Sequence, residues 1–336
     1  MKKIDICNPC VRVYGLPLFY KNGLFERVPK NVREAVPSLE MLGRRCTGTR
    51  VCMRTNSKTV KVVMDFETYS PDIGMSIFAC QSANVYIGSH ADSKFMGLVN
   101  PGSYSAKHSE GTFTKSGSFE DVMVLIPRNE VIAYIGFEVD DDAQLELPQQ
   151  YTYETPVLFY GSSITEGGCC SRLASAYPNI ISRHLDTDYI NFGFSGSAKG
   201  EAAMADYIGS LDISMLVMDY DYNSPSPEHL AATHEAFFKQ IRRHKPELPV
   251  LILSCPNPEY MPEAEKRLEI IRQTYENALA AGDKNVYFIN GREFYGETDR
   301  DYCTVDTTHP TDLGFYRMAN VIEPVIKKVL ELQHKR

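Results

Sequence analysis

Residues 157–168 read VLFYGSSITEGG, and this segment sets the architecture of the C-terminal half of the chain. Its first four residues, Val157–Tyr160, are apolar without a break, which is typical of a strand buried on both faces. Gly161 then allows a tight turn, and the helix expected after the turn would present unpaired backbone N–H groups at its start. The segment therefore predicts a buried strand, a turn and a helix.

The same alternation continues to the end of the chain. Further continuous apolar runs lie at residues 189–192, 214–218, 250–253 and 286–289. Helix candidates follow the runs at residues 176–185, 201–208, 227–244, 263–281 and 312–331. This rhythm predicts an α/β fold, a flavodoxin-like doubly wound parallel sheet with helices on both faces. In such sheets the functional site lies beyond the carboxyl ends of the strands.

The N-terminal half has a different pattern. Short runs rich in Val, Ile, Tyr and Phe, separated by Gly, Ser, Asn and Pro, lie at residues 59–66, 75–80, 84–87, 122–126 and 131–137. They predict an all-β jelly roll or sandwich. The acidic, proline-containing segment 140–156 is interpreted as a linker. We therefore expect two domains, a β-sandwich at residues 1–150 and an α/β domain at residues 151–336.

Composition limits the classes of partner. The chain has 336 residues and a formal net charge of −8, so it has no electrostatic reason to seek nucleic acid or an anionic membrane. No stretch approaches the roughly 20 apolar residues that cross a bilayer. The N-terminus carries Lys2 and Lys3 but lacks the apolar core of a signal peptide, which predicts a cytoplasmic protein.

The nine cysteines predict neither a disulfide framework nor a metal site. Cys7 and Cys10 form one C-x-x-C pair, but no second pair with zinc-like spacing accompanies it. Reduced and mostly buried thiols are the favoured interpretation. Nothing in the chain calls for a metal or an organic cofactor.

Three residues with suitable chemistry follow the first three predicted strands. Ser163 is placed to act as a nucleophile, although a plain turn or a phosphate cradle would also use small residues here. Gly193 would let a backbone N–H approach an anion, or would simply form a turn. The side-chain amide of Asn223 could donate to an oxyanion, or form an Asx-turn.

Asp306 and His309 lie just before the last predicted helix. With two residues between them, one loop can direct the carboxylate to one imidazole nitrogen and leave the other to take a proton from Ser163. A metal-ligand role or a helix-cap role for His309 stays open on these residues alone. Because all these groups fall at one edge of the sheet, together they predict a Ser–His–Asp hydrolase.

Four blocks in this order resemble those of the SGNH hydrolases, a superfamily of GDSL-type esterases and lipases. They read GSSIT at 161–165, NFGFSG at 191–196, DYDYN at 219–223 and DTTHP at 306–310. The resemblance extends from about Thr155 to Val329. It implies a catalytic triad of Ser163, Asp306 and His309, and an oxyanion hole formed by Ser163, Gly193 and Asn223. Two departures, Ser162 in place of Asp and no Asp after Asn223, remove no catalytic group.

The segment GSSITEGGCCSRLASAYP, with GFSG and GMSIFAC (residues 74–80), is similar to a bacterial subgroup that carries an extra N-terminal β-domain. Carbohydrate acetyl esterases share this layout. The resemblance implies hydrolysis of short acyl esters, above all acetyl esters, on a small molecule or an oligosaccharide. Alternatives are a thioesterase or lipase-type acylhydrolase on a non-sugar substrate, and a noncatalytic carbohydrate-binding protein. The β-domain could line the cleft or serve packing or dimerisation, so a homo-oligomer stays open.

Overall fold

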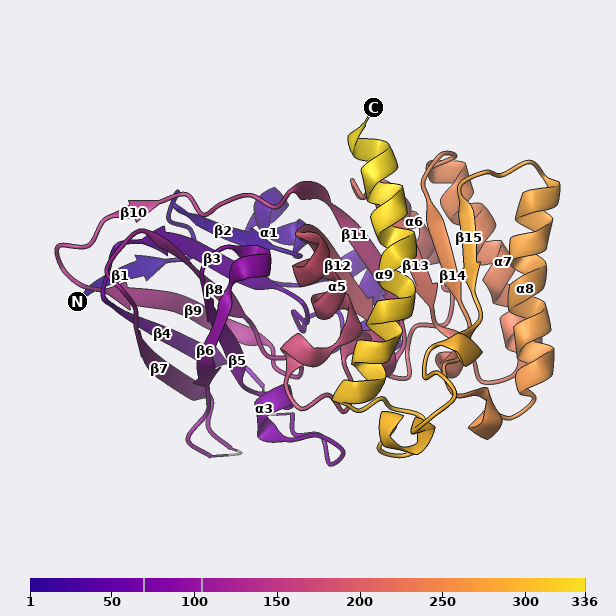
Figure 1. Ribbon diagram of the computed structural model, residues 1–336, viewed down its shortest axis with the longest axis horizontal. Coiled ribbons are helices and arrows are strands. Elements are labelled where there is room, and N and C mark those ends of the chain that lie inside the picture. Colours follow the sequence, from indigo (N-terminus) through magenta and orange to yellow (C-terminus); the bar gives the residue numbers. More distant parts are fainter. Residues whose placement is uncertain (69, 104, 336) are drawn as a thin grey trace.

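The computed structural model describes residues 1–68, 70–103 and 105–335. Its N-terminal strands form a β-sandwich on the left of Figure 1, and its C-terminal half forms an α/β layer structure on the right. Among the described residues, no helix combines the length and the apolar character that a membrane span requires.

A five-stranded parallel sheet forms the centre of the C-terminal half. Its spatial order is β12 (Thr187–Gly193), β11 (Tyr153–Gly161), β13 (Met215–Asp219), β14 (Val250–Leu253) and β15 (Val286–Ile289). This is the 2-1-3-4-5 order of flavodoxin-like sheets, so the predicted fold class is confirmed. All residues of β12 and β13 are buried, as their apolar sequences require.

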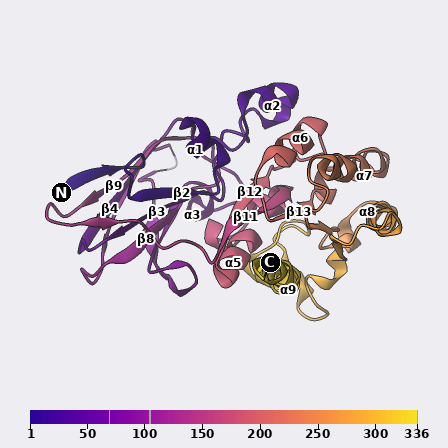
Figure 2. The ribbon, with the colours of Figure 1, turned by 90° about the horizontal axis from the view of Figure 1, so that it is seen from above.

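Helices cover both faces of this sheet (Figure 2). On one face, α6 (Ala202–Ser210), α7 (Pro227–His244) and α8 (Ala264–Ala280) contribute to a shared core. On the other, α5 (Tyr177–Leu185) and α9 (Asp312–His334) pack together. A single short turn of helix, α4 (Ser163–Glu166), follows β11. The predicted helices agree with the observed ones to within a few residues.

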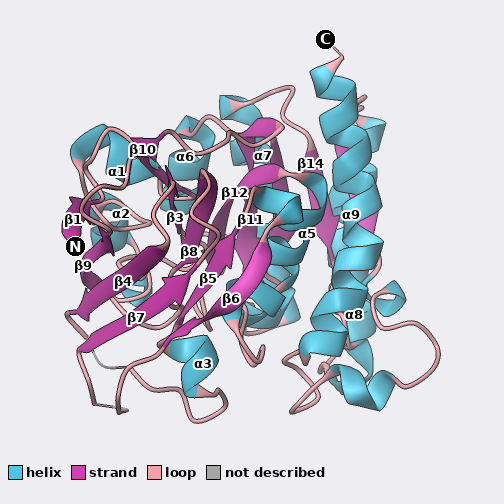
Figure 3. Ribbon diagram, turned by 60° about the vertical axis from the view of Figure 1, so that its left-hand side comes forward, coloured by secondary structure: helices cyan, strands magenta, loops and turns pink. Residues whose placement is uncertain are grey.

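Two antiparallel sheets form the β-sandwich (Figure 3). One sheet contains β1 (Lys2–Asp5), β9 (Ile132–Val139), β4 (Thr59–Phe66) and β7 (His108–Thr114). The other contains β10 (Leu145–Glu146), β3 (Arg50–Thr55), β8 (Glu120–Leu125), β5 (Ala83–Ile87) and β6 (Lys94–Val99), with β2 (Val11–Tyr14) paired to β3. Every second residue of β4 is buried, which is the alternation of a strand with one face on a core.

Two details of the N-terminal half differ from the prediction. The run at residues 75–80 is not a strand, because Ile77–Cys80 forms the short helix α3. A short apolar run has no period that separates a strand from a buried helical turn. The segment at 140–156, expected to be a linker, contains β10 and the first residues of β11, so part of it is paired within sheets.

The two halves share a hydrophobic core. The segment with α1 (Pro17–Asn22) and α2 (Lys30–Ala35) contributes Leu18, Val28, Val32, Val36 and Leu39 to the core beneath β12 and α6. Figure 2 shows α2 beside α6, on the far side of the molecule from α9. This shared core joins the N-terminal segment to the parallel sheet and its helices.

Candidate active site

Ser163 lies at the start of α4, directly after β11. The Ser162 hydroxyl caps this helix by accepting from the Ile164 N–H at 3.2 Å. The Ser162 N–H donates to the Asp219 carbonyl at 3.1 Å, which ties the turn to β13. Ser162, which stands where the resembling family has Asp, therefore supports the turn that presents Ser163.

Asp306 and His309 lie in the loop before α9. The Asp306 carboxylate accepts from the backbone N–H groups of Thr308 at 3.0 Å and His309 at 2.6 Å, which closes the loop on itself. From the loop that follows β14, the Asn257 amide donates to the Thr307 carbonyl at 2.8 Å. The Asp306–His309 loop is thus held by its own hydrogen bonds and by a neighbouring loop.

The three predicted side chains meet in one hydrogen-bonded chain. Ser163 Oγ lies 2.8 Å from His309 Nε2, and His309 Nδ1 lies 2.7 Å from Asp306 Oδ2. Partial burial raises the pKa of Asp306, but the hydrogen bonds from His309 and Thr308 lower it by more, so its pKa falls below the usual value. An ionised Asp306 can therefore orient the His309 ring.

A cavity of about 420 Å³ opens at Ser163, His309 and Asp306, and both halves of the protein line it. The α/β half contributes Ser163, Gly168, Cys169, Ser195, Gly196, Tyr222, Asn223, Asp306, Thr308 and His309. The β-sandwich half contributes Asp72, Gly74, Met75 and Arg128. The β-sandwich is therefore part of the site wall.

Gly193 is not part of this cavity, which corrects its expected role. Its N–H donates to Asn191 Oδ1 at 2.8 Å and is already used. A side chain at this position would collide with α4, since a Cβ would lie 2.2 Å from the Glu166 nitrogen. Gly193 thus permits close packing of strand and helix. The sequence interpretation failed because two glycines lie in NFGFSG and spacing alone does not say which one faces the site.

Gly196 lines the cavity beside Ser163 and Asn223. Its φ of +66° lies in the left-handed region, which glycine adopts without strain. Among the described residues, neither the Gly196 N–H nor the Ser163 N–H has an acceptor. Asn223 donates through its amide to the Phe194 carbonyl at 2.9 Å, which places it against the same loop. These groups form a set of donors around Ser163.

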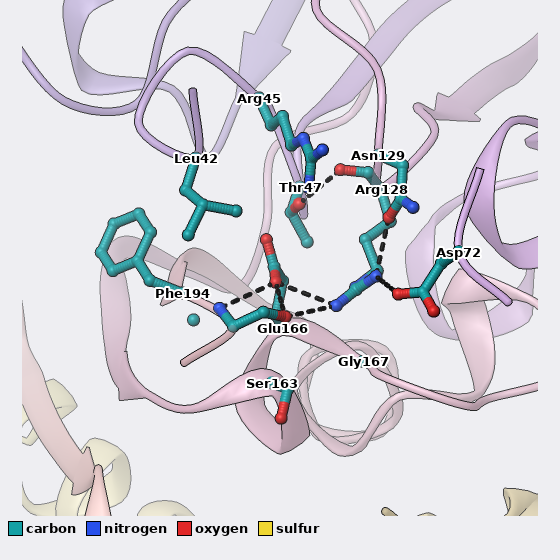
Figure 4. A network of polar contacts seen from close by, with 12 residues as sticks. Leu42, Arg45, Thr47, Asp72, Arg128, Asn129, Ser163, Glu166, Gly167 and Phe194 are labelled. Atoms are coloured by element: carbon teal, nitrogen blue, oxygen red, sulfur yellow. Dashed lines mark hydrogen bonds and ion pairs between the residues drawn. The ribbon is translucent and has the colours of Figure 1, made fainter. Parts of the chain in front are cut away.

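A buried ion-pair network, missed by the sequence interpretation, lies behind the site (Figure 4). Glu166, the last residue of α4, is fully buried and pairs with Arg27 at 3.2 Å and with Arg128 at 3.0 Å. Burial raises the pKa of Glu166, but the charges of Arg128 and Arg27 lower it by more, so its net shift is downward. Because the partners lie 139 and 38 residues away, no local pattern could have revealed them.

We expect Glu166→Gln to lower the free energy of unfolding by about 3–5 kcal/mol, because it leaves two buried arginines with too little negative charge. A carboxylate with a lowered native pKa stabilises above its unfolded pKa and loses that contribution as the pH falls through the native value. The free energy of unfolding of the variant should therefore also depend less on pH in the acid range. Denaturant unfolding between pH 3 and 8 measures both effects.

Glu228→Gln is the matched control, since Glu228 pairs with Lys266 at an exposed position. Its unfolding midpoint should stay near that of the wild type. If both variants lost the same free energy of unfolding, the buried network would contribute no more to stability than an exposed ion pair does.

No group of three or more His, Cys, Asp or Glu side chains in the described part of the chain is arranged to hold a metal ion. All nine cysteines are free thiols.

Solved structures share this fold over nearly the whole chain. A GDSL-like lipase of Bacteroides ovatus is 24% identical, with a TM-score of 0.87 and 98% of each chain covered. The salicylyl-acyltransferase SsfX3 of a tetracycline biosynthetic pathway is 16% identical, with a TM-score of 0.78 and 98% of this chain and 97% of that chain covered. A family two carbohydrate esterase of Cellvibrio japonicus is 11% identical, with a TM-score of 0.63 and 98% of each chain covered.

No curated protein sequence matches the chain. A sequence model of a protein family does match, and it covers residues 154–327. That range begins in β11 and ends within α9, so it includes Ser163, Asn223, Asp306 and His309. Because the match spans more than half of the chain, this protein belongs to the GDSL-like lipase/acylhydrolase family.

Proposed function

We propose that this protein is a serine esterase that removes short acyl groups, acetyl above all, from hydroxyl groups of carbohydrates. The observation that carries the proposal is the hydrogen-bonded chain from Ser163 Oγ through His309 to Asp306, which opens on a cavity with N–H donors. A nucleophile, a base and a group that orients the base within hydrogen-bond reach are the requirements of acyl transfer through a covalent intermediate.

In the first half-reaction, Ser163 Oγ attacks the ester carbonyl while His309 Nε2 takes the hydroxyl proton. The N–H groups of Ser163 and Gly196 and the Asn223 amide stabilise the negative oxygen of the tetrahedral intermediate. His309 then returns the proton to the leaving alkoxide, so the alcohol departs and the acyl group stays on Ser163. A water molecule, deprotonated by the same imidazole, releases the acid and restores the hydroxyl.

The cavity wall supports a short and polar substrate. Its lining includes Asp72 and Thr308, which can hydrogen-bond to hydroxyl groups but offer little to a long hydrocarbon chain. The net charge of −8 favours neutral substrates over anionic ones. The carbohydrate esterase from Cellvibrio japonicus, which has the same fold, supports a sugar ester as the substrate class.

A series of p-nitrophenyl esters tests the proposal. We expect kcat/KM to be highest for the acetate and to fall for the butyrate and the octanoate. Acetylated xylo-oligosaccharides should release acetate. A maximum at octanoate would contradict the short-chain preference, and faster cleavage of thioacetate than of acetate esters would favour a thioesterase. A fluorophosphonate probe should label Ser163, and an unlabelled protein would be a noncatalytic binder.

A further inference from the structure

The loop that carries Gly196 is held by an arginine of the β-sandwich. Arg128, in the loop between β8 and β9, donates from Nη2 to Ser195 Oγ at 2.6 Å and to Glu166 Oε2 at 3.0 Å. Ser195 in turn donates to the same carboxylate oxygen from its hydroxyl at 2.6 Å and from its backbone N–H at 3.1 Å. Arg128, Ser195 and Glu166 thus form a closed triangle one residue before Gly196.

Arg128 is itself rigidly held, with only 2% of its surface exposed. Its Nη1 donates to Asn129 Oδ1 at 2.7 Å and lies 3.5 Å from Asp72 Oδ2. Figure 4 shows Arg128 between Glu166 on one side and Asp72 on the other. The carboxylates of Glu166 and Asp72 neutralise the positive charge of Arg128. Arg128 is therefore suited to hold other groups in place rather than to attract an anionic substrate.

We propose that Arg128 is a positioning residue, through which the β-sandwich holds the Ser195–Gly196 loop so that the Gly196 N–H faces the oxyanion. This inference rests on the proposed function, since it concerns the donors around Ser163. It also assigns a task to the β-sandwich that the parallel sheet cannot perform alone.

The physical reason is preorganisation. An N–H donor stabilises a developing charge best if it already points at it. Gly196, at φ +66°, has no side chain that could fix the direction of its N–H. The hydrogen bonds among Arg128, Ser195 and Glu166 fix Ser195, and Ser195 in turn limits the movement of Gly196, the next residue. A guanidinium can do this because it donates from one nitrogen to Ser195 and Glu166 while the other nitrogen contacts Asn129 and Asp72. Lysine has the charge but not this fork.

The test compares Arg128→Lys and Arg128→Met with wild type on p-nitrophenyl acetate. Loss of one oxyanion donor typically lowers turnover by about 10²–10³-fold, so misalignment of Gly196 should lower kcat by up to about 10²-fold with KM changed by less than about 3-fold. Arg128→Lys should fold, since it keeps the charge beside Glu166, and should still lose most of its turnover. Turnover of Arg128→Lys and Arg128→Met within 3-fold of wild type would overturn the proposal.

Arg50→Met is the matched control. Arg50 is also a buried arginine of the β-sandwich, but it pairs with Asp188 at the start of β12, at the opposite end of the strand from the site. It should lower the melting temperature and leave kcat of the folded protein near the wild-type value. An equal loss of kcat in Arg50→Met would mean that Arg128 acts only through general stability.

A double-mutant cycle with Ser195→Ala separates positioning from other effects. If Arg128 acts through Ser195, the kcat losses of Arg128→Met and Ser195→Ala should be far less than additive on a logarithmic scale. Additive losses would contradict the proposal. So would an unchanged kcat in Ser195→Ala, which can be measured even if Arg128→Met does not fold. Failure of the wild-type protein to cleave any ester would instead reject the proposed function.

Discussion

Replacing Ser163 by Ala is expected to lower kcat on p-nitrophenyl acetate by about 10⁶-fold, to the level of the reaction that the remaining groups support. Without Oγ there is no covalent intermediate, and the His309 imidazole has no hydroxyl to deprotonate. The oxyanion donors remain, so a small rate above that in buffer should persist. Steady-state kinetics at high enzyme concentration measures this remaining activity.

Two further measurements make the Ser163 result specific. The melting temperature of Ser163→Ala should match the wild type, because the helix is capped by Ser162 and not by Ser163. Labelling by a fluorophosphonate should vanish in Ser163→Ala and persist in Ser116→Ala, which changes a serine of an exposed β-sandwich loop. Activity of Ser163→Ala within tenfold of wild type would reject the mechanism.

Replacing Asp306 by Asn is expected to lower kcat by about 10⁴-fold. An asparagine oxygen can still accept from the backbone of Thr308 and His309, so the loop should keep its shape. Its amide, however, can donate to His309 Nδ1, which favours the tautomer whose proton sits on Nε2. That tautomer cannot accept the proton of Ser163. Kinetics at pH 7 to 8 compares the variant with wild type.

Asp301→Asn is the control for Asp306→Asn, since Asp301 is an exposed carboxylate of the same region. Its turnover should equal that of the wild type. If Asp306→Asn kept more than a tenth of the wild-type kcat, the carboxylate would be dispensable, and a dyad of Ser163 and His309 would replace the triad.

The sequence alone determined the parallel sheet, because continuous apolar runs separated by amphipathic segments have few folds that bury them. The runs at 250–253 and 286–289 became β14 and β15 with the same boundaries. It also predicted which side chains would meet, since the carboxyl ends of parallel strands share one edge. Ser163, Asp306 and His309 do lie there within hydrogen-bond reach.

Tertiary structure decided which glycine faces the cavity and what holds it. Gly193 and Gly196 lie three positions apart. The Gly193 N–H donates to Asn191 Oδ1, and α4 packs closely against Gly193. The network around Glu166 depends on arginines from loops of the β-sandwich. Periodicity and local motifs report which face of an element is buried. They do not report which distant side chain compensates a buried charge, because that follows from how separate elements dock.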